Sequence, residues 1–227
     1  MLEPIRILRS ISGASGDHVY TLHYSPSTAS LAVHWMLLEL KVPFELALVD
    51  FERKQQKSAD YLRLNPSGRV PTLIVDGEPR TETAALLMLL AERHPESRLS
   101  PLPGAPERAD YLQWMMYFAN TVQPAFRAWF YPSEPAGEAN IDAAKGQARE
   151  QIETAWSRVD SQLAGRSFIV GDRVTAADFL ATMLMRWSRN MPKPATHWPT
   201  LAAYAQRTRA MPSYRAMHDA EKLTEWI

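Results

Sequence analysis

A proline-rich segment divides this chain into two halves with different hydrophobic patterns. Residues 95–106 contain four prolines and Gly104, a composition typical of a linker between domains. Before this linker, short apolar runs rich in β-branched residues alternate with longer apolar runs; after it, apolar residues recur at helical spacing. We therefore expect an N-terminal extension over 1–18, an α/β domain over 19–94 and an all-α domain over 107–227.

The first half alternates strand and helix patterns. Residues 19–24 and 42–49 suit strands, and the largely apolar run 31–40 between them is typical of a buried helix. Two strands joined by a helix predict a parallel βαβ unit. A more polar helix is expected over 55–64, and the segment 65–91 completes the order β-α-β-α-β-β-α.

The segment 65–91 contains a turn, a hairpin and a second buried helix. Residues 65–68 (Asn-Pro-Ser-Gly) have turn chemistry, and residues 76–77 (Asp-Gly) can close a tight hairpin after a strand over 72–75. Residues 84–91 contain no polar side chain. They are expected to form a helix that is buried on nearly all sides.

Two parts of this segment could bind a small peptide. Val70 precedes Pro71, which favours an extended backbone whose N–H and C=O can pair with a ligand as in strand addition. Thr81, Glu82 and Thr83 lie where the helix should begin. The free N–H groups and the helix dipole there favour an anion, while Glu82 can hold an ammonium group. This combination suits the charged end of a peptide.

These residues resemble the binding motif of a known family. Arg69-Val70-Pro71 followed by Thr81-Glu82-Thr83 is similar to the glutathione-binding motif of glutathione transferases. The resemblance covers residues 19 to about 220 and implies that family's fold, an α/β thioredoxin-like N-terminal domain followed by an all-α C-terminal helical bundle. It also implies a cis peptide bond before Pro71 and a Glu-Thr pair that holds the γ-glutamyl end of glutathione. The implied glutathione-binding residues are Tyr24, Lys54, Arg69, Val70, Pro71, Glu82 and Thr83.

The resemblance also implies an activity. The chain would be a glutathione S-transferase that conjugates glutathione to small hydrophobic electrophiles or reduces organic hydroperoxides, as in detoxification. Glutathione would be its co-substrate, no metal would be needed, and the protein would be a cytoplasmic homodimer. Two alternatives stay open, because a fold does not fix a function. One is a glutathione- or ligand-binding protein with little catalysis, and the other is a glutathione-dependent isomerase or dehalogenase.

The chain has no cysteine, so any sulfur chemistry must use a thiol that the ligand brings. Members of the family ionise the glutathione thiol with a hydrogen bond and with the positive end of the first helix. The loop over 24–30 is similar to that of the bacterial beta class. However, Ala29 stands where that class has a cysteine, and Gln123 stands where it has a histidine. Redox chemistry of the beta-class kind is therefore in doubt.

The loop offers several hydroxyl groups as hydrogen-bond donors to sulfur. Ser27 matches the serine of the serine-type classes and is the first candidate, with Thr28 the second. Ser25, Ser30 and Tyr24 also remain candidates. Capping of the following helix is an equal alternative role for each small hydroxyl residue.

The second half supplies candidates for a substrate pocket and a structural motif. Trp114, Tyr117, Gln123 and Arg127 could line a pocket for the electrophile, although aromatic residues at this spacing are also typical of a helical core. Residues 175–178 (Thr-Ala-Ala-Asp) form a capping box that resembles the start of the family's buried sixth helix. This motif is expected to support folding rather than catalysis.

Charge and hydropathy restrict the partners. Lysine plus arginine equals aspartate plus glutamate at 25 each, and zero net charge argues against a nucleic-acid or anionic membrane partner. No apolar run approaches the length of a transmembrane helix.

Overall fold

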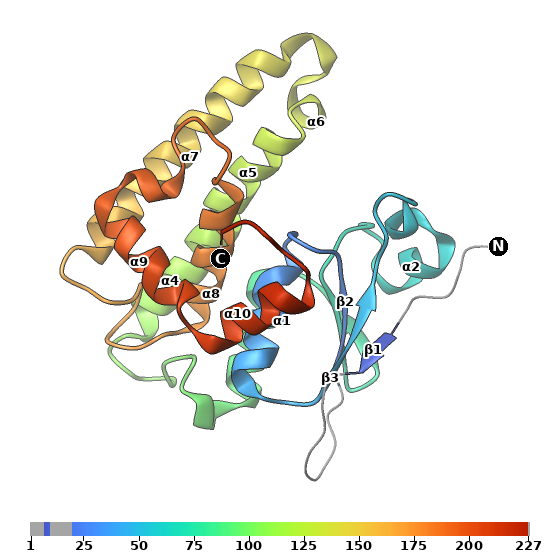
Figure 1. Ribbon diagram of the computed structural model, residues 1–227, viewed down its shortest axis with the longest axis horizontal. Coiled ribbons are helices and arrows are strands. Elements are labelled where there is room, and N and C mark those ends of the chain that lie inside the picture. The colour runs from blue at the N-terminus through green and yellow to red at the C-terminus, as the bar shows by residue number, and fades with distance from the viewer. Residues whose placement is uncertain (1–6, 10–19, 227) are drawn as a thin grey trace. The chain divides into compact units, whose positions relative to one another are not determined.

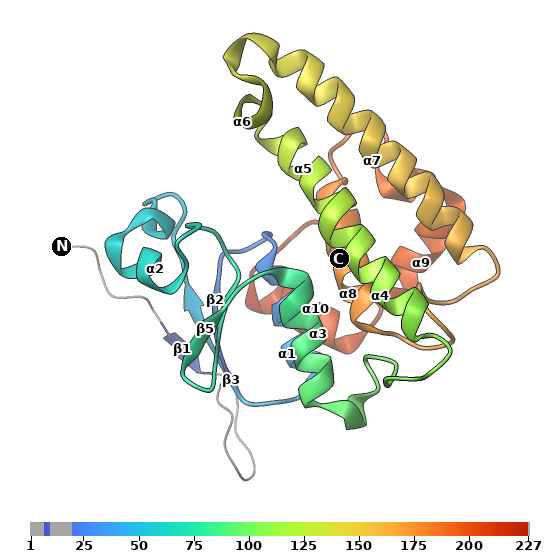
Figure 2. The ribbon, with the colours of Figure 1, turned by 180° about the vertical axis from the view of Figure 1, so that it is seen from behind.

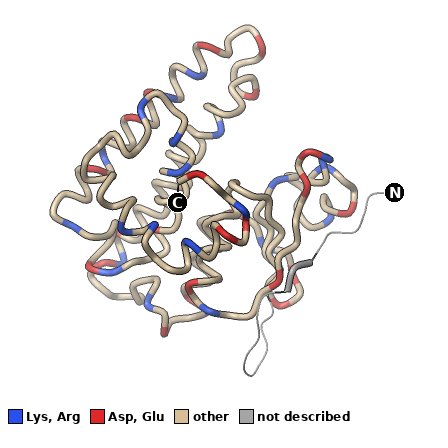
Figure 3. The backbone as a smooth tube through the Cα atoms, viewed as in Figure 1, with Lys and Arg blue, Asp and Glu red and all other residues tan. Residues whose placement is uncertain are grey.

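The computed structural model describes residues 7–9 and 20–226 (Figure 1). The chain forms two compact units. The first contains the chain up to Ser97 together with Pro212–Glu225, and the second contains Arg98–Met211 together with Trp226. Among the described residues, no helix is both long enough and apolar enough to cross a membrane. Figure 3 shows acidic and basic residues interspersed along each unit.

A five-stranded mixed sheet forms the centre of the first unit, in the order β1-β3-β2-β4-β5. β2 and β3 run parallel, and the other neighbouring pairs run antiparallel. The predicted βαβ unit is therefore present, and the fold class is confirmed as thioredoxin-like. The strands are β1 (Ile7–Arg9), β2 (Tyr20–Tyr24), β3 (Phe44–Leu48), β4 (Thr72–Val75) and β5 (Glu78–Arg80).

Helices flank this sheet. The apolar runs become α1 and α3, which pack against each other (Figure 2). The helix expected over 55–64 is divided at Ser58, because this serine caps a new helix by accepting the backbone N–H of Tyr61 at 3.2 Å. The helices of this unit are α1 (Ser30–Leu40), η1 (Gln55–Lys57), α2 (Ala59–Leu64), α3 (Thr83–Arg93), η2 (Pro95–Ser97) and α10 (Pro212–Ala220).

The N-terminal extension contributes an additional strand. The sequence predicts that 1–18 is an arm outside the domain, but Ile7–Arg9 pairs antiparallel with β3, with Ile7 opposite Ala47. Backbone hydrogen bonds depend little on side-chain identity, so a short segment can pair with an open sheet edge without a strong strand pattern. The rest of the extension lies outside the described residues.

Every regular element among the described residues of the second unit is a helix. The helical stretch from Arg108 to Phe130 is interrupted by a π-turn, in which the N–H of Gln123 bonds to the carbonyl of Phe118. Pro124 follows and has no N–H to donate, which explains a break at this point. The helices are α4 (Arg108–Tyr117), η3 (Phe118–Val122), α5 (Gln123–Phe130), α6 (Ser133–Ala136), η4 (Glu138–Asn140), α7 (Ile141–Leu163), α8 (Ala176–Trp187), η5 (Ala195–His197) and α9 (Pro199–Arg209).

The expected capping box begins α8, whose residues from Ala176 to Arg186 are all buried. The carboxylate of Asp178 accepts the backbone N–H of Thr175 at 2.7 Å, the N–H of Ile169 at 2.9 Å and the hydroxyl of Tyr204 at 2.8 Å. Burial raises the pKa of Asp178 to about 6, although these hydrogen bonds favour the ionised form. The box therefore joins three segments of the core.

The C-terminal helix differs from expectation. The sequence places the range 107–227 in the second domain, but α10 packs on α1 in the first unit. The indole N–H of Trp35 donates to Ser213 Oγ at 2.9 Å, and the Ser213 hydroxyl donates to Glu39 at 2.5 Å. The apolar surface of α1 is thus covered by a helix from the far end of the chain.

Candidate functional site

The edge that is predicted to bind a peptide lies in the first unit, around the Val70–Pro71 bond. The Val70–Pro71 peptide bond is cis, as the resemblance implied, and both residues are buried. Neither the N–H nor the C=O of Val70 has a hydrogen-bond partner among the described residues. The backbone groups expected to pair with a peptide ligand are therefore available.

The start of α3 supplies the charged part of the site. Glu82 is the N-cap residue, with φ of 70°, and its carbonyl accepts the N–H of Leu86 at 2.9 Å. Its side chain is exposed and makes no hydrogen bond or ion pair with a described residue. Thr83 is buried, and its hydroxyl donates to the carbonyl of Ala29 at 3.3 Å. This bond ties the start of α3 to the start of α1.

Two predicted cationic ligands are also unpaired. The side chains of Lys54 and Arg69 are exposed, and neither makes an ion pair with a described residue. Lys54 precedes η1 in a left-handed backbone conformation, with φ of 54°. Both cations are free to meet a carboxylate.

The loop between β2 and α1 is held by its own hydroxyl groups. The hydroxyls of Thr28 and Ser30 donate to the carbonyl of Ser25, at 2.7 and 3.1 Å. The backbone N–H of Ser30 also lies 3.4 Å from the Thr28 hydroxyl oxygen. These contacts give Thr28 a role in shaping the loop. Ser27 lies at the turn, half-buried, with φ of 64°.

A buried carboxylate that sequence reasoning missed supports this loop. Glu221 Oε2 accepts the backbone N–H of Ser27 at 3.0 Å, and its Oε1 lies 2.9 Å from His34 Nδ1. Its side chain is fully buried. Its partners are 194 and 187 residues away in the chain, so no local pattern could indicate the contact.

Tyr24 lies beneath the loop rather than at its surface. The residue is 4% exposed, and its ring contacts that of His34 with 6.0 Å between the centroids. Burial raises the pKa of Tyr24, and the charge of Glu221 adds to this effect. The tyrosine therefore supports the loop from beneath, and its expected contact with glutathione stays a prediction.

Two residues expected in the substrate pocket have structural partners, and their place in such a pocket stays a prediction. Trp114 is 3% exposed and packs against Phe118 in the core of the second unit. Arg127 pairs with Glu134, with Nε 2.7 Å from Oε2, and its guanidinium lies 3.8 Å from the ring centroid of Tyr131. Both side chains therefore have structural partners that account for them.

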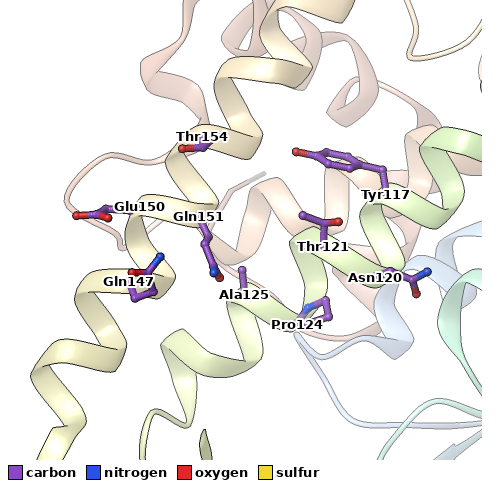
Figure 4. Close-up of a pocket in the computed structure, with 9 residues that line it drawn as sticks. All are labelled: Tyr117, Asn120, Thr121, Pro124, Ala125, Gln147, Glu150, Gln151 and Thr154. Atoms are coloured by element: carbon purple, nitrogen blue, oxygen red, sulfur yellow. The ribbon is translucent and has the colours of Figure 1, made fainter. Parts of the chain in front are cut away.

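Tyr117 and Gln123 are half-buried and remain candidates. Figure 4 shows Tyr117 beside an open depression between the η3–α5 segment and α7, about 510 Å³ in volume. Gln123 does not line this depression. The lining residues are Tyr117, Asn120, Thr121, Pro124, Ala125, Gln147, Glu150, Gln151 and Thr154.

The fold defines a protein with a thioredoxin-like first unit and a helical second unit. Residues 26–93 match the family described as "Glutathione S-transferase, N-terminal domain", and residues 113–212 match "Glutathione S-transferase, C-terminal domain". The chain therefore belongs to the glutathione S-transferase family.

Individual relatives agree with this assignment. Glutathione S-transferase GST-4.5 of Xanthomonas campestris pv. campestris is 34% identical over 203 residues, which cover 89% of this chain and 98% of that protein. Glutathione S-transferase GstA of Escherichia coli O157:H7 is 30% identical over 204 residues, with the same coverage of 89% and 98%. The structure of a sphingomonad glutathione S-transferase complexed with glutathione gives a TM-score of 0.80 at 33% identity, covering 90% of this chain and 100% of that one. The predicted family, fold and transferase activity are confirmed.

Proposed function

We propose that this glutathione S-transferase binds glutathione along Val70 by strand addition and conjugates it to small hydrophobic electrophiles. The observation that carries the binding mode is the backbone of Val70, whose N–H and C=O are unpaired among the described residues. Glu82 holds the γ-glutamyl ammonium, and the first N–H groups of α3 hold the neighbouring carboxylate. The free cations of Lys54 and Arg69 are available to the glycyl carboxylate.

Ser27 is proposed as the residue that activates the thiol. A free thiol ionises with a pKa of about 8.5 and is mostly protonated at pH 7, so a donor that stabilises the thiolate increases the supply of nucleophile. The hydroxyl of Thr28 donates to the Ser25 carbonyl, which gives Thr28 a structural role in the loop. The thiolate then attacks the electrophilic carbon and displaces its leaving group.

We also propose a homodimer that acts in the cytoplasm. On α4, Leu112 and Met116 are one helical turn apart and are 36% and 42% exposed, which favours an apolar contact with a second copy. The absence of cysteine is consistent with a reducing compartment.

Turnover tests the proposed activity directly. Purified protein should conjugate glutathione to an aryl halide and should reduce an organic hydroperoxide if the second expected activity is present. Ala29 and Gln123 replace the beta-class cysteine and histidine, which favours a pure binding protein as the second candidate. Glutathione binding without turnover of either substrate would support that candidate, and turnover would exclude it.

A further inference from the structure

We infer that Tyr61 and Asn65 are positioning residues for glutathione, because together they hold the backbone that the ligand must pair with. This inference rests on the proposed binding of glutathione along Val70. Tyr61 belongs to α2, and Asn65 follows that helix directly. Both residues are buried, at 0% and 4% exposure.

The two side chains meet at one carbonyl oxygen. Tyr61 Oη donates to the carbonyl of Arg69 at 2.7 Å, and Asn65 Nδ2 donates to the same oxygen at 2.8 Å. This carbonyl belongs to the peptide group whose N–H is that of Val70. Fixing the oxygen therefore fixes the direction in which the Val70 N–H points.

The same two side chains also hold the residue after Pro71. Thr72 Oγ1 lies 2.9 Å from Tyr61 Oη, and Asn65 Nδ2 donates to Thr72 Oγ1 at 3.2 Å. Tyr61 has a single hydroxyl hydrogen, which goes to Arg69, so the hydroxyl of Thr72 must donate to Tyr61. Each hydrogen of the Asn65 amide then has one acceptor. The result is a closed ring of four hydrogen bonds in which every donor is used once.

Other contacts fix the orientation of this ring. Asn65 Oδ1 accepts the backbone N–H of Ser67 at 3.1 Å, so a flipped amide would place its NH₂ group against a donor. The ring of His23 meets that of Tyr61 edge-on, with 5.9 Å between centroids. Burial raises the pKa of Tyr61, which keeps its hydroxyl protonated. The segment from Arg69 to Thr72 is thus held at both ends, while Val70 between them keeps its own groups for a ligand.

The test measures how a substitution in the protein alters the effect of a chemical modification of the ligand. The probes are S-methylglutathione and two derivatives, each N-methylated at one of its two peptide nitrogens, so thiol ionisation does not contribute. Tyr61→Phe removes the hydroxyl and should raise the calorimetric Kd of S-methylglutathione about five- to twentyfold, the effect of one lost hydrogen bond. Tyr214→Phe is the matched control, because it removes a buried tyrosine hydroxyl that bonds to His218 in the same unit.

A positioning role also predicts a change in the N-methyl penalty, which is the factor by which N-methylation of the ligand raises its Kd. In the wild type, methylation of the ligand nitrogen whose N–H pairs with the Val70 carbonyl should weaken binding strongly. In Tyr61→Phe this penalty should fall at least about threefold, because the ring that holds Arg69 and Thr72 on either side of the Val70 carbonyl is broken, whereas Tyr214→Phe should retain the penalty. An unchanged penalty in Tyr61→Phe, or a Kd equal to that of Tyr214→Phe, would overturn the inference.

Two further outcomes are distinguishable. If Tyr61→Phe does not fold, the isosteric Thr72→Val variant takes its place, since it removes one bond of the same ring, and the same comparison decides the inference. If the wild-type protein binds neither glutathione nor S-methylglutathione, the proposed binding mode itself fails, and this inference fails with it.

Discussion

At the scale of single residues, the proposed site uses side chains that have no partner among the described residues. Glu82 is the clearest example, because its carboxylate is exposed beside the start of α3 and pairs with no described residue. Folding does not require a carboxylate beside a helix N-terminus to lack a positively charged partner. The unpaired carboxylate of Glu82 is explained if the ammonium group of a ligand is its positively charged partner.

The first prediction follows from this free carboxylate. Glu82→Gln should raise the Kd for glutathione about three- to thirtyfold, because a hydrogen bond to a charged group is lost at a partly solvated site. The melting temperature should change little, since the side chain makes no hydrogen bond or ion pair within the described part of the chain. Calorimetry measures the affinity, with Glu78→Gln, another exposed glutamate in the same unit, as the control. Equal affinity in the two variants would remove Glu82 from the site.

The second prediction concerns the proposed sulfur donor. Ser27→Ala should raise the pKa of the bound glutathione thiol by about one to two units, the value of a hydrogen bond to a charged group. Alanine keeps the Cβ atom, so the left-handed backbone at this position is no more strained than with serine. Titration of the thiolate absorbance measures the shift. Thr28→Ala should shift the pKa much less, and an identical titration in Ser27→Ala and wild type would show that Ser27 is not the sulfur donor.

At the scale of elements, predictability depends on whether the signal is local. Apolar runs, turn sequences and the capping box are local, and they located α1, β4, α3 and the start of α8. The division at Ser58 and the π-turn before Pro124 were missed, because both interrupt a pattern that is helical on each side. The Val70 edge was found from its motif, whereas Glu221 could not be, because its partners come from the other end of the sequence.

The third prediction uses the capping residue of α8. The pKa of Asp178 is about 6 in the folded protein and near 3.8 when unfolded, so the folded state binds more protons between these values. The contribution of Asp178 to the free energy of unfolding should therefore increase as the pH falls from 7 to 4. Asp178→Asn removes this dependence. The stability difference between wild type and variant should change by roughly 2–3 kcal/mol over this range.

Urea unfolding at several pH values measures this difference, and subtraction of the variant cancels the other titrating groups. Asp172→Asn serves as the control, because its side chain is 88% exposed. The assigned pKa direction is wrong if the wild-type advantage over Asp178→Asn grows as the pH rises.

At the scale of the whole molecule, the chain returns to the unit in which it began. The helix α10 packs on α1, and the residue that follows it by one position, Glu221, reaches the loop proposed to activate the thiol. The first unit is therefore not a continuous stretch of sequence. Composition and periodicity correctly separated an α/β half from a helical half, but they assigned the last helix by its position in the chain. The position of α10 is determined by the apolar surface of α1, against which it packs.

The last prediction concerns the contact between the C-terminal segment and the loop that joins β2 to α1. Glu221 offers two carboxylate oxygens, one to the Ser27 N–H and one to His34 Nδ1. Glu221→Gln keeps the shape of the side chain but replaces one carboxylate oxygen with an NH₂ group. If the NH₂ group faces Ser27, it cannot accept the Ser27 N–H. If it faces His34, it replaces the oxygen that lies beside His34 Nδ1. The free energy of unfolding should fall by about 1–3 kcal/mol, the effect of disturbing one buried polar contact. The Kd for glutathione should rise as well, because the loop loses part of its support. Urea unfolding and calorimetry measure the two effects, with Glu225→Gln as an exposed control four residues further along. If both glutamine variants behave alike, the C-terminal segment does not support the site, and the loop is held by its own hydroxyl groups and by the bond from Thr83 to Ala29.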